Sequence, residues 1–257
     1  MSVLTSRDNA KVKRWAKLAN DPRYRKSEKR ALIEGPHLLA AALQHGHKPV
    51  AVLATEEGAA DPEISRLIRA SGLRPVLLAK GTFRGLVDTE TPPGVAAEIA
   101  IPEAPKKEEA SRVVFLEGVQ DPANVGAIMR SAAAFGVQQV ILDPGCADPW
   151  SPKALRAGMG GHFLLQIGQT RDLAAAIDTF KGTVACTVPR GGGALGDSPF
   201  ERSWAWIFGA EGRGLSDETI RRADLRVTIA MAAGAESLNV AAAAAICLYE
   251  AFSRSAA

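Results

Sequence analysis

The sequence predicts an α/β protein of two domains, and three observations support this. Strand-like apolar stretches alternate with helix-like stretches in both halves of the chain, which is typical of sheets covered by helices. Two prolines and a charged cluster in IPEAPKKEEAS, residues 101–111, indicate a linker between the halves. The 257 residues are 47% hydrophobic and 23% charged, an ordinary composition for one large or two modest globular domains.

The first domain is expected to be a small α/β domain over residues 1–100. Apolar periodicity predicts helices at 8–20, 36–44 and 62–71, the second of them with Pro36 in its first turn. Short apolar runs predict strands at 31–34, 49–54, 75–78 and 94–100.

The second domain, residues 112–257, shows the cleaner alternation and predicts a mainly parallel sheet with helices on both faces. Strands are expected at 113–116, 140–142, 163–167, 183–188, 204–208 and 225–229. Helices are expected at 124–135, 151–157, 171–180, 216–222 and 237–252. Asn124 is placed to cap the first of these helices, and residues 189–200 read as a flexible loop.

Positive charge is concentrated at the N-terminus, where residues 1–35 contain ten Lys or Arg against four acids. The whole chain has a formal net charge of only +3, so the remainder is slightly acidic. Basic residues interleaved with Trp15 and Tyr24 suit an RNA backbone and unstacked bases, whereas the alternative is a solvated basic helix. The candidate RNA-binding residues are Arg7, Lys11, Lys13, Arg14, Arg23, Arg25 and Lys26.

Several classes of protein are disfavoured. The N-terminus lacks the apolar core of a signal peptide, and the longest apolar run, 240–249, is too short to span a bilayer, so a cytoplasmic protein is expected. The three cysteines contain no CxxC pair, which indicates neither a disulfide framework nor a zinc site, and His45 and His47 fit a solvated helix end better than a metal site. No dinucleotide-binding or P-loop motif occurs.

Three segments rich in small residues each hold a few isolated polar groups, which suggests one shared site. Arg130 is the only charge between Asp121 and Asp143, and Glu211 stands among glycines in FGAEGRGLS. Glu236 is accompanied by Ser237 and Asn239 in the segment before the last helix.

Each polar group also has a purely structural interpretation. Asn124 or Ser237 could be only a helix cap, Arg130 could form an ion pair with Glu211 or Glu236, and the glycines could form only a turn. Asn239, expected inside an apolar helix, would need buried partners.

The three segments resemble the three ordered motifs of the SpoU–TrmH family of RNA 2′-O-ribose methyltransferases, within the SPOUT superfamily. The resemblance covers about residues 112–254. The first motif matches at Asn124, Gly126 and Arg130, and the second at Gly209, Glu211, Gly212, Gly214, Leu215 and Ser216. The third motif matches at Ile229, Met231, Gly234, Ser237, Leu238, Asn239 and Val240. Residues 1–100, through SRDNAKVKRWAKL and ALIEGPHLLAAAL, resemble the substrate-binding domain of rRNA-modifying members.

The resemblance implies a deep trefoil knot, a rare exception to the usual topology rules, and a homodimer in which the apolar last helix forms part of the interface. It implies S-adenosylmethionine as cofactor, contacted by Gly209, Ile229 and Leu238, with Met231 nearby. The implied activity is methylation of a ribose 2′-hydroxyl in RNA, with ribosomal RNA favoured. A tRNA ribose methyltransferase and a non-catalytic, ribosome-associated RNA-binding protein are the alternatives.

The resemblance also implies roles for the polar residues. Arg130 is expected to act on the 2′-hydroxyl, either in its deprotonation or as an electrostatic clamp, although arginine is a very poor base because it holds its proton tightly. Glu211 would orient Arg130, while Asn124, Ser237 and Asn239 would fix phosphate and ribose, without a metal. The chain departs from the family at Ala230, where a proline is usual, which frees one backbone N–H and loosens the loop.

Overall fold

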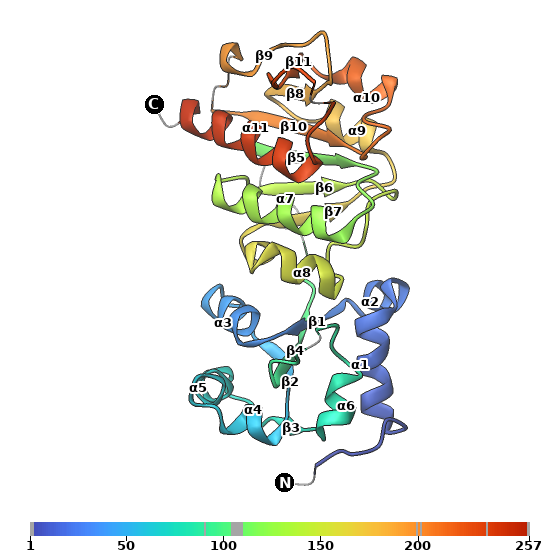
Figure 1. Ribbon diagram of the computed structural model, residues 1–257, viewed down its shortest axis with the longest axis vertical. Helices are drawn as coiled ribbons and strands as arrows, with labels where there is room; N and C mark the ends of the chain where they lie inside the picture. The colour runs from blue at the N-terminus through green and yellow to red at the C-terminus, as the bar shows by residue number, and fades with distance from the viewer. Residues whose placement is uncertain are drawn as a thin grey trace. The chain divides into compact units, whose positions relative to one another are not determined.

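The computed structural model describes residues 3–89, 91–103, 110–198, 200, 202–234 and 236–255. The chain forms two compact units, which Figure 1 shows as separate groups of helices and strands. The first unit comprises Met1–Pro102 together with Asp148–Phe163, and the second comprises Glu103–Ala147 and Leu164–Ala257. Most of the expected linker, residues 104–109, lies outside the described residues.

The first unit is built on a four-stranded mixed sheet. Its strands run in the order β1 (Arg30–Glu34), β4 (Val95–Ala100), β2 (Pro49–Ala54) and β3 (Val76–Leu77). Strand β4 is antiparallel to both β1 and β2, and β2 is parallel to β3. All four strands lie where the sequence predicts them.

The expected helices of this unit are α1 (Ala10–Asn20), α3 (Pro36–Gln44) and α5 (Pro62–Ser71). Three further helices, α2 (Pro22–Glu28), α4 (Glu56–Ala60) and α6 (Lys80–Arg84), were not predicted. Each of these has seven residues or fewer, which is too short for a helical period to show. A start signal was present at α2, where the Asp21 side chain accepts hydrogen bonds from Arg23 N and Tyr24 N.

Residues 148–163, expected to belong to the second domain, pack with the first unit. They include helix α8 (Pro152–Gly158) and most of the 3₁₀ helix η1 (Gly161–Leu164). Arg156 of α8 donates to Glu34 at 3.3 Å and to Asp88 at 2.7 Å. At Gly160, where φ is +89°, a Cβ would stand only 2.7 Å from the Ala41 Cβ, so the two backbones approach closely.

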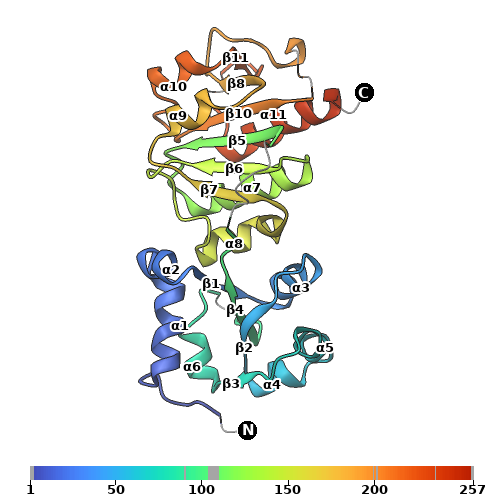
Figure 2. The ribbon, with the colours of Figure 1, turned by 180° about the vertical axis from the view of Figure 1, so that it is seen from behind.

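The second unit contains a seven-stranded sheet in which every strand pair is parallel. Its strands run in the order β7 (Gln166–Gln169), β6 (Gln139–Leu142), β5 (Arg112–Glu117), β10 (Trp204–Gly209), β8 (Thr183–Thr187), β11 (Leu225–Thr228) and β9 (Gly193–Ala194). Helices α7 (Pro122–Ala134) and α11 (Val240–Ser255) cover one face, and α9 (Leu173–Asp178) and α10 (Asp217–Arg222) lie on the other, which Figure 2 shows. The predicted parallel sheet with helices on both faces is confirmed.

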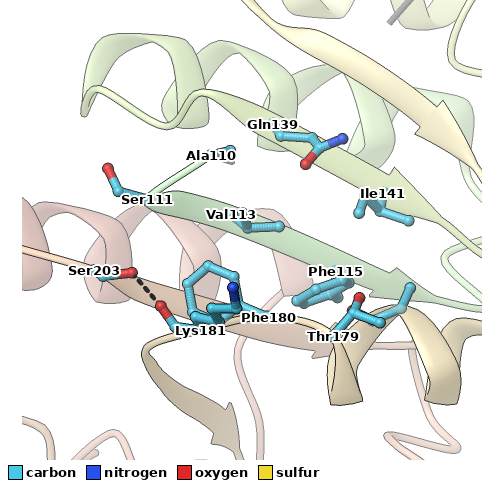
Figure 3. Close-up of a pocket in the computed structure, with 11 residues that line it drawn as sticks. Ala110, Ser111, Val113, Phe115, Gln139, Ile141, Thr179, Phe180, Lys181 and Ser203 are labelled. Atoms are coloured by element: carbon cyan, nitrogen blue, oxygen red, sulfur yellow. Dashed lines mark hydrogen bonds between the residues drawn. The ribbon is translucent and has the colours of Figure 1, made fainter. Parts of the chain in front are cut away.

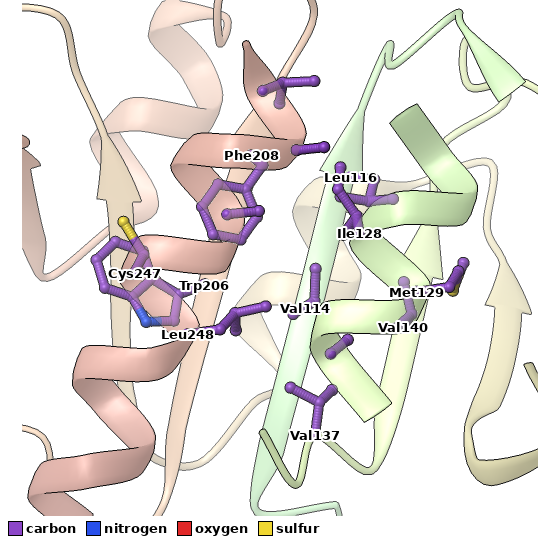
Figure 4. Close-up of a cluster of buried hydrophobic side chains, with 14 of the residues drawn as sticks. Val114, Leu116, Ile128, Met129, Val137, Val140, Trp206, Phe208, Cys247 and Leu248 are labelled. Atoms are coloured by element: carbon purple, nitrogen blue, oxygen red, sulfur yellow. The ribbon is translucent and has the colours of Figure 1, made fainter. Parts of the chain in front are cut away.

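The main core of the second unit lies between the sheet and the helix pair α7–α11. In β5, Val114 and Leu116 face this core, while Val113 and Phe115 face the α9 side, as the period of a strand requires. Figure 4 shows Trp206 and Phe208 of β10 meeting Leu248 of α11 in this layer. The alanine-rich face of α11 allows close packing on α7 and the sheet.

Four local predictions were wrong. Helix α7 begins at Pro122 with Asp121 as its cap, so Asn124 lies in the first turn, because an Asp-Pro start places an acceptor and a preset φ together. Helix α11 begins at Val240, and the Asn239 side chain caps it by accepting from Ala241 N and Ala242 N, so Ser237 is not the cap. Residues 189–200 include the short strand β9 and the 3₁₀ helix η2 (Leu195–Asp197), and β7 starts at Gln166 because η1 occupies the preceding residues.

Among the described residues, no helix has both the length and the apolar character needed to cross a membrane.

Candidate active site at the carboxyl edge of the parallel sheet

The polar motifs gather where the parallel strands end. Parallel strands present all their carboxyl ends at one edge of a sheet, where α/β proteins bind their ligands. The first motif follows β5, the second follows β10, and the third follows β11. The sheet order places β5 directly beside β10, so the loops after these two strands are neighbours.

Three side chains, one from each motif, are hydrogen-bonded to one another. Asn124 Nδ2 and Asn239 Nδ2 both donate to Glu211 Oε1, the first at 2.5 Å and the second at 3.1 Å. Asn239 Nδ2 also lies 3.0 Å from Asn124 Oδ1. Because these residues are separated by 87 and 28 positions along the chain, the fold alone brings them together.

The turn that carries Glu211 is tightly folded over the end of β10. Gly214 N donates to Ala210 O at 2.8 Å, and Ser216 N donates to Glu117 Oε2 at 3.0 Å. A Cβ at Gly209 would stand 2.6 Å from the Gly214 carbonyl carbon, so only glycine fits there. The second motif therefore holds Glu211 in a fixed place beside Asn124 and Asn239.

Arg130 does not form the ion pair with Glu211 or Glu236 that was the structural interpretation of this residue. The residue is exposed on α7, and it forms no ion pair or hydrogen bond with another described residue, Glu211 and Glu236 included. Its sequence neighbours Ile128 and Met129 point to the core, because adjacent residues of a helix face different directions. The guanidinium is therefore free to meet a ligand, and Glu211 is held by the two asparagines.

The loop after β11 exposes apolar side chains and free backbone groups. Met231 is 36% exposed and Leu238 is 40% exposed, while Ile229 is half-buried against the core. Within the described residues, no hydrogen bond involves the backbone of 230–234 or 236–238. Ser237 and Glu236 are also exposed. Such a loop can offer both apolar contact and backbone hydrogen bonds to a ligand.

The basic N-terminal segment divides into structural and exposed residues. Arg14 donates to both carboxylate oxygens of the buried Glu98, at 2.6 and 2.8 Å, which holds the pKa of that carboxyl below its usual range despite the opposing effect of burial. Arg25 is only 3% exposed and donates to Asp148 at 2.7 Å. These two assignments to RNA binding are corrected, because both guanidinium groups are occupied within the unit.

The five other basic candidates remain accessible. Arg7 donates to Gly81 O at 3.0 Å yet stays exposed, and Lys13 pairs with the fully exposed Asp8. Lys11, Arg23 and Lys26 are exposed on α1 and α2.

The three cysteines are suited to packing rather than to chemistry. Burial raises the pKa of the Cys146 and Cys247 thiols to about 12 and that of Cys186 to about 11. No group of three or more His, Cys, Asp or Glu that could hold a metal ion occurs in the part of the chain that the structure describes.

A pocket of about 310 Å³ lies away from this edge, on the α9 face of the sheet. Figure 3 shows Ser111 and Gln139, at the amino ends of β5 and β6, on its lining together with Phe180. Its position at the opposite ends of the strands separates it from the three motifs.

Two features of the site were not predicted from the sequence. Gly118, with φ +67°, follows β5 and lies beside the side chain of Arg213, a residue of FGAEGRGLS for which no role was predicted. Asp143 accepts from Gly118 N at 2.9 Å and Gly145 N at 3.0 Å, which orders the loop after β5. The sequence signal for both was a charged residue next to glycines after a strand.

Comparison with known proteins identifies what the two parts of the chain are similar to. Residues 111–249 match the model of the SpoU rRNA Methylase family, and residues 9–97 match that of the MRM3-like substrate binding domain. The chain is 33% identical over 252 residues to the 23S rRNA (guanosine(2553)-2′-O)-methyltransferase RlmP of Bacillus subtilis, covering 97% of this chain and 98% of that protein.

Solved structures agree with these similarities. A crystal structure of an RNA 2′-O ribose methyltransferase superposes with a TM-score of 0.84 at 28% identity, covering 98% of this chain and 99% of that one. The SpoU methyltransferase AviRb from Streptomyces viridochromogenes, in complex with the cofactor AdoMet, superposes with a TM-score of 0.83 at 27% identity, covering 96% and 98%.

Proposed function

The chain belongs to the SpoU rRNA methylase family, and we propose that it methylates a ribose 2′-hydroxyl of ribosomal RNA with S-adenosylmethionine as the methyl donor. The observation that carries this proposal is the hydrogen-bonded cluster of Asn124, Glu211 and Asn239, which joins all three motifs at one edge of the sheet. RlmP, similar over nearly the whole chain, is by its name a 23S rRNA 2′-O-methyltransferase, which favours ribosomal RNA as the substrate.

The residues at the edge fit the proposed cofactor. The faces of its adenine ring are apolar, and its remaining groups are polar or charged, which matches the exposed Met231 and Leu238 beside unpaired backbone groups. Gly209, Ile229, Met231 and Leu238 would hold the cofactor. When bound, S-adenosylmethionine supplies a methyl group activated by a sulfonium centre.

The side chains of this chain would position the nucleotide and its charge. Asn124 keeps one amide N–H that can donate to a ribose or phosphate oxygen, and Ser237 can add a hydroxyl donor from the exposed loop. Both N–H groups of Asn239 are used within the cluster, so Asn239 would hold Asn124 and Glu211 in place for the nucleotide. Glu211 fixes the two amides, because its Oε1 accepts from both. Glu211 makes no bond with Arg130 of the same chain, and its expected role in orienting Arg130 stays a proposal for the Arg130 of a second copy.

Arg130 would stabilise the developing charge on the 2′-oxygen and a neighbouring phosphate. A guanidinium stays protonated at any physiological pH, so it favours the alkoxide electrostatically and does not accept the proton, which leaves to a phosphate or to solvent. Its exposed and unpaired state among the described residues leaves its donors available for such a ligand.

Arg130 and Asn124 lie on different parts of α7, which supports the proposal of a homodimer. Asn124 belongs to the asparagine cluster, the hydrogen-bonded group of Asn124, Glu211 and Asn239. Six residues separate Arg130 from Asn124, or about 9 Å along a helix axis, so the two side chains do not point at one place. On the adjacent helix α11, Ile246 is 41% exposed and Tyr249 is 57% exposed, with Tyr249 edge-on to Phe135 of α7. A second copy on this apolar face could bring its Arg130 to this cluster.

The trefoil knot is also part of the proposal. The end of α11 contacts η2, and Arg254 donates to Gly196 O in the segment between β8 and β10. Strand β9, in the same segment, pairs with β11. These contacts are those expected if the last helix passes close to β9 and η2 in a knotted chain.

The compartment proposed for such an enzyme is the cytoplasm, where bacterial ribosomal RNA is modified.

The exposed basic residues Arg7, Lys11, Lys13, Arg23 and Lys26 would bind RNA phosphates in the substrate-binding domain. The domain limits of 1–100 and 112–257 remain part of the proposal, and residues 148–163 belong to the first compact unit.

The test is a methyl-transfer assay on ribosomal RNA, followed by mapping of 2′-O-methyl sites in cells with and without the protein. Arg130→Ala should lower kcat by at least about 100-fold and leave cofactor affinity unchanged. Arg130→Lys keeps the charge without the bidentate donors and should recover part of the rate. Full turnover by Arg130→Ala, or methylation of a base in place of a ribose, would contradict the proposal.

A homodimer predicts that Tyr249→Asp combined with Ile246→Asp shifts the sedimentation coefficient toward that of a monomer. Val50→Asp is the matched control, because Val50 is an equally exposed hydrophobic residue of the first unit. A wild-type protein that sediments as a monomer at micromolar concentration would exclude the dimer.

A further inference from the structure

Arg213 lies on the same tight turn as Glu211 but points to a different neighbour. The turn is closed between Ala210 and Gly214 and carries Glu211 into the asparagine cluster. Arg213 Nη2 stands 3.5 Å from where a Cβ on Gly118 would be, so its guanidinium lies beside the loop after β5. The absence of a side chain at Gly118 leaves room for it.

The carboxylates around this loop already accept hydrogen bonds from groups other than Arg213. Glu117 accepts from Ser216 N, Asp143 accepts from Gly118 N and Gly145 N, and Glu211 accepts from the two asparagines. Arg213 itself is exposed and forms no ion pair or hydrogen bond with any described residue. A positive charge at a ligand-binding edge that has no anionic partner among the described residues is suited to an external anion.

The backbone on both sides of Arg213 lets a ligand come close. Gly212 and Gly214 have φ values of +78° and +69°, and a Cβ at either position would meet nothing within 4 Å. A polymer strand can therefore pass over the turn without meeting side chains next to the guanidinium. The planar fork of arginine matches two oxygens of a phosphate.

We propose that Arg213 binds a backbone phosphate of the RNA substrate beside the target nucleotide, and so guides the strand across the edge of the sheet. The proposal rests on the proposed function, since it takes RNA as the substrate. Arg213 is here a substrate-binding residue with no part in proton transfer. The carboxylate of the cofactor is the other anionic group that Arg213 can bind. The binding measurements below distinguish it from an RNA phosphate.

The experiment compares Arg213→Ala, Arg213→Lys and the control Arg221→Ala, which removes an exposed arginine of α10 in the same unit. The probe is an unmodified 23S ribosomal RNA transcript. Arg213→Ala should raise KM for RNA about 10-fold, with kcat within about twofold, because the lost contact is a charge-assisted hydrogen bond made in the bound state. Arg213→Lys should recover part of this loss, and Arg221→Ala should match the wild type.

Two binding measurements identify the anion. In filter binding between 50 and 200 mM salt, Arg213→Ala should flatten the slope of log K against log salt by about 0.7 to 0.9, the contribution of one phosphate contact. Calorimetric affinity for S-adenosylmethionine should stay unchanged in all variants, which also shows that the turn is intact.

Three results would overturn the inference: an unchanged KM and salt slope, a fall in kcat alone, or a loss of cofactor affinity in place of RNA affinity. Failure of the proposed function is distinguishable, because it would appear as a wild-type protein that methylates no RNA ribose. The filter-binding comparison would then still test whether Arg213 contacts RNA.

Discussion

The ion pair between Arg25 and Asp148 gives the sharpest stability prediction. The Arg25 side chain is 4% exposed, and its Nε donates to Asp148 Oδ2 at 2.7 Å. Its Nη1 also donates to Leu18 O at 2.7 Å and Ala19 O at 3.0 Å, two carbonyls in the last turn of α1. Arg25 thus joins the end of α1 to the segment 148–163 that packs with it.

Replacing Arg25 by alanine should remove all three bonds and leave Asp148 without its cation. Breaking a buried pair by removing one partner costs about 3–5 kcal/mol. Because the Asp148 side chain is 21% exposed, water can solvate part of the remaining charge, so the lower half of that range is expected. Asp148→Asn, which keeps an oxygen acceptor, should cost less.

Urea unfolding measures this cost, and hydrogen exchange locates it in α1 and in residues 148–163. The matched control is Arg23→Ala, since Arg23 is an exposed arginine of the same helix and should change the free energy of unfolding by no more than about 0.5 kcal/mol. A double-mutant cycle with Asp148→Ala should give a coupling energy of about 1–3 kcal/mol. If Arg25→Ala were as stable as Arg23→Ala and lost only RNA affinity, Arg25 would be an RNA contact and the reasoning would fail.

Three further predictions concern single groups. Burial holds the pKa of His162 at about 4, below the 6.5 of the free side chain, so the unfolded state binds the proton first and the free energy of unfolding should fall as pH drops from 6.5 to 4. His162→Gln should flatten this dependence in urea titrations at each pH, and an unchanged slope would show that the ring is not buried neutral. Ala230→Pro, which restores the residue usual in the family, should tighten cofactor binding by up to about 1 kcal/mol in calorimetry by restricting the free loop, whereas weaker binding would show that the loop needs another φ. The raised pKa values of Cys146, Cys186 and Cys247 predict that a thiol reagent at pH 8 labels none of them in the native protein and all three in urea, so native labelling would contradict their burial.

Regular elements were predictable because they repeat over many residues. All strands of both sheets except the two-residue β9, together with the longer helices, followed from the apolar period, and the structure confirms them. The exact starts of α7 and α11 did not follow, since several residues in a row could serve as a cap. Asp121 caps α7 and Asn239 caps α11 in the structure. Long-range contacts at the carboxyl edge of the sheet decide between the candidate caps, and local sequence does not contain them.

The assignment of residues 148–163 to the first unit could not be read from sequence. The segment lies between β6 and β7 of the second unit, so adjacency along the chain suggests one domain. Two long-range pairs hold the segment in the first unit. They are Arg25 with Asp148 and Arg156 with Glu34, separated by 123 and 122 positions along the chain. Local periodicity carries no information about such pairs.

The arginines show why residue type alone does not locate a site. Arg25, expected on RNA, is buried in an ion pair, whereas Arg130, for which an ion pair with Glu211 or Glu236 was the structural alternative, is exposed and forms none among the described residues. Residue type predicts that each arginine meets an anion but not where that anion lies, because successive side chains of a helix point in different directions. An arginine whose bonds are satisfied within the chain contributes stability, and one with free donors can bind an external anion. That distinction separates Arg25 from Arg130 and Arg213, and the substitution experiments measure it as lost stability for Arg25, lost turnover for Arg130 and lost RNA affinity for Arg213.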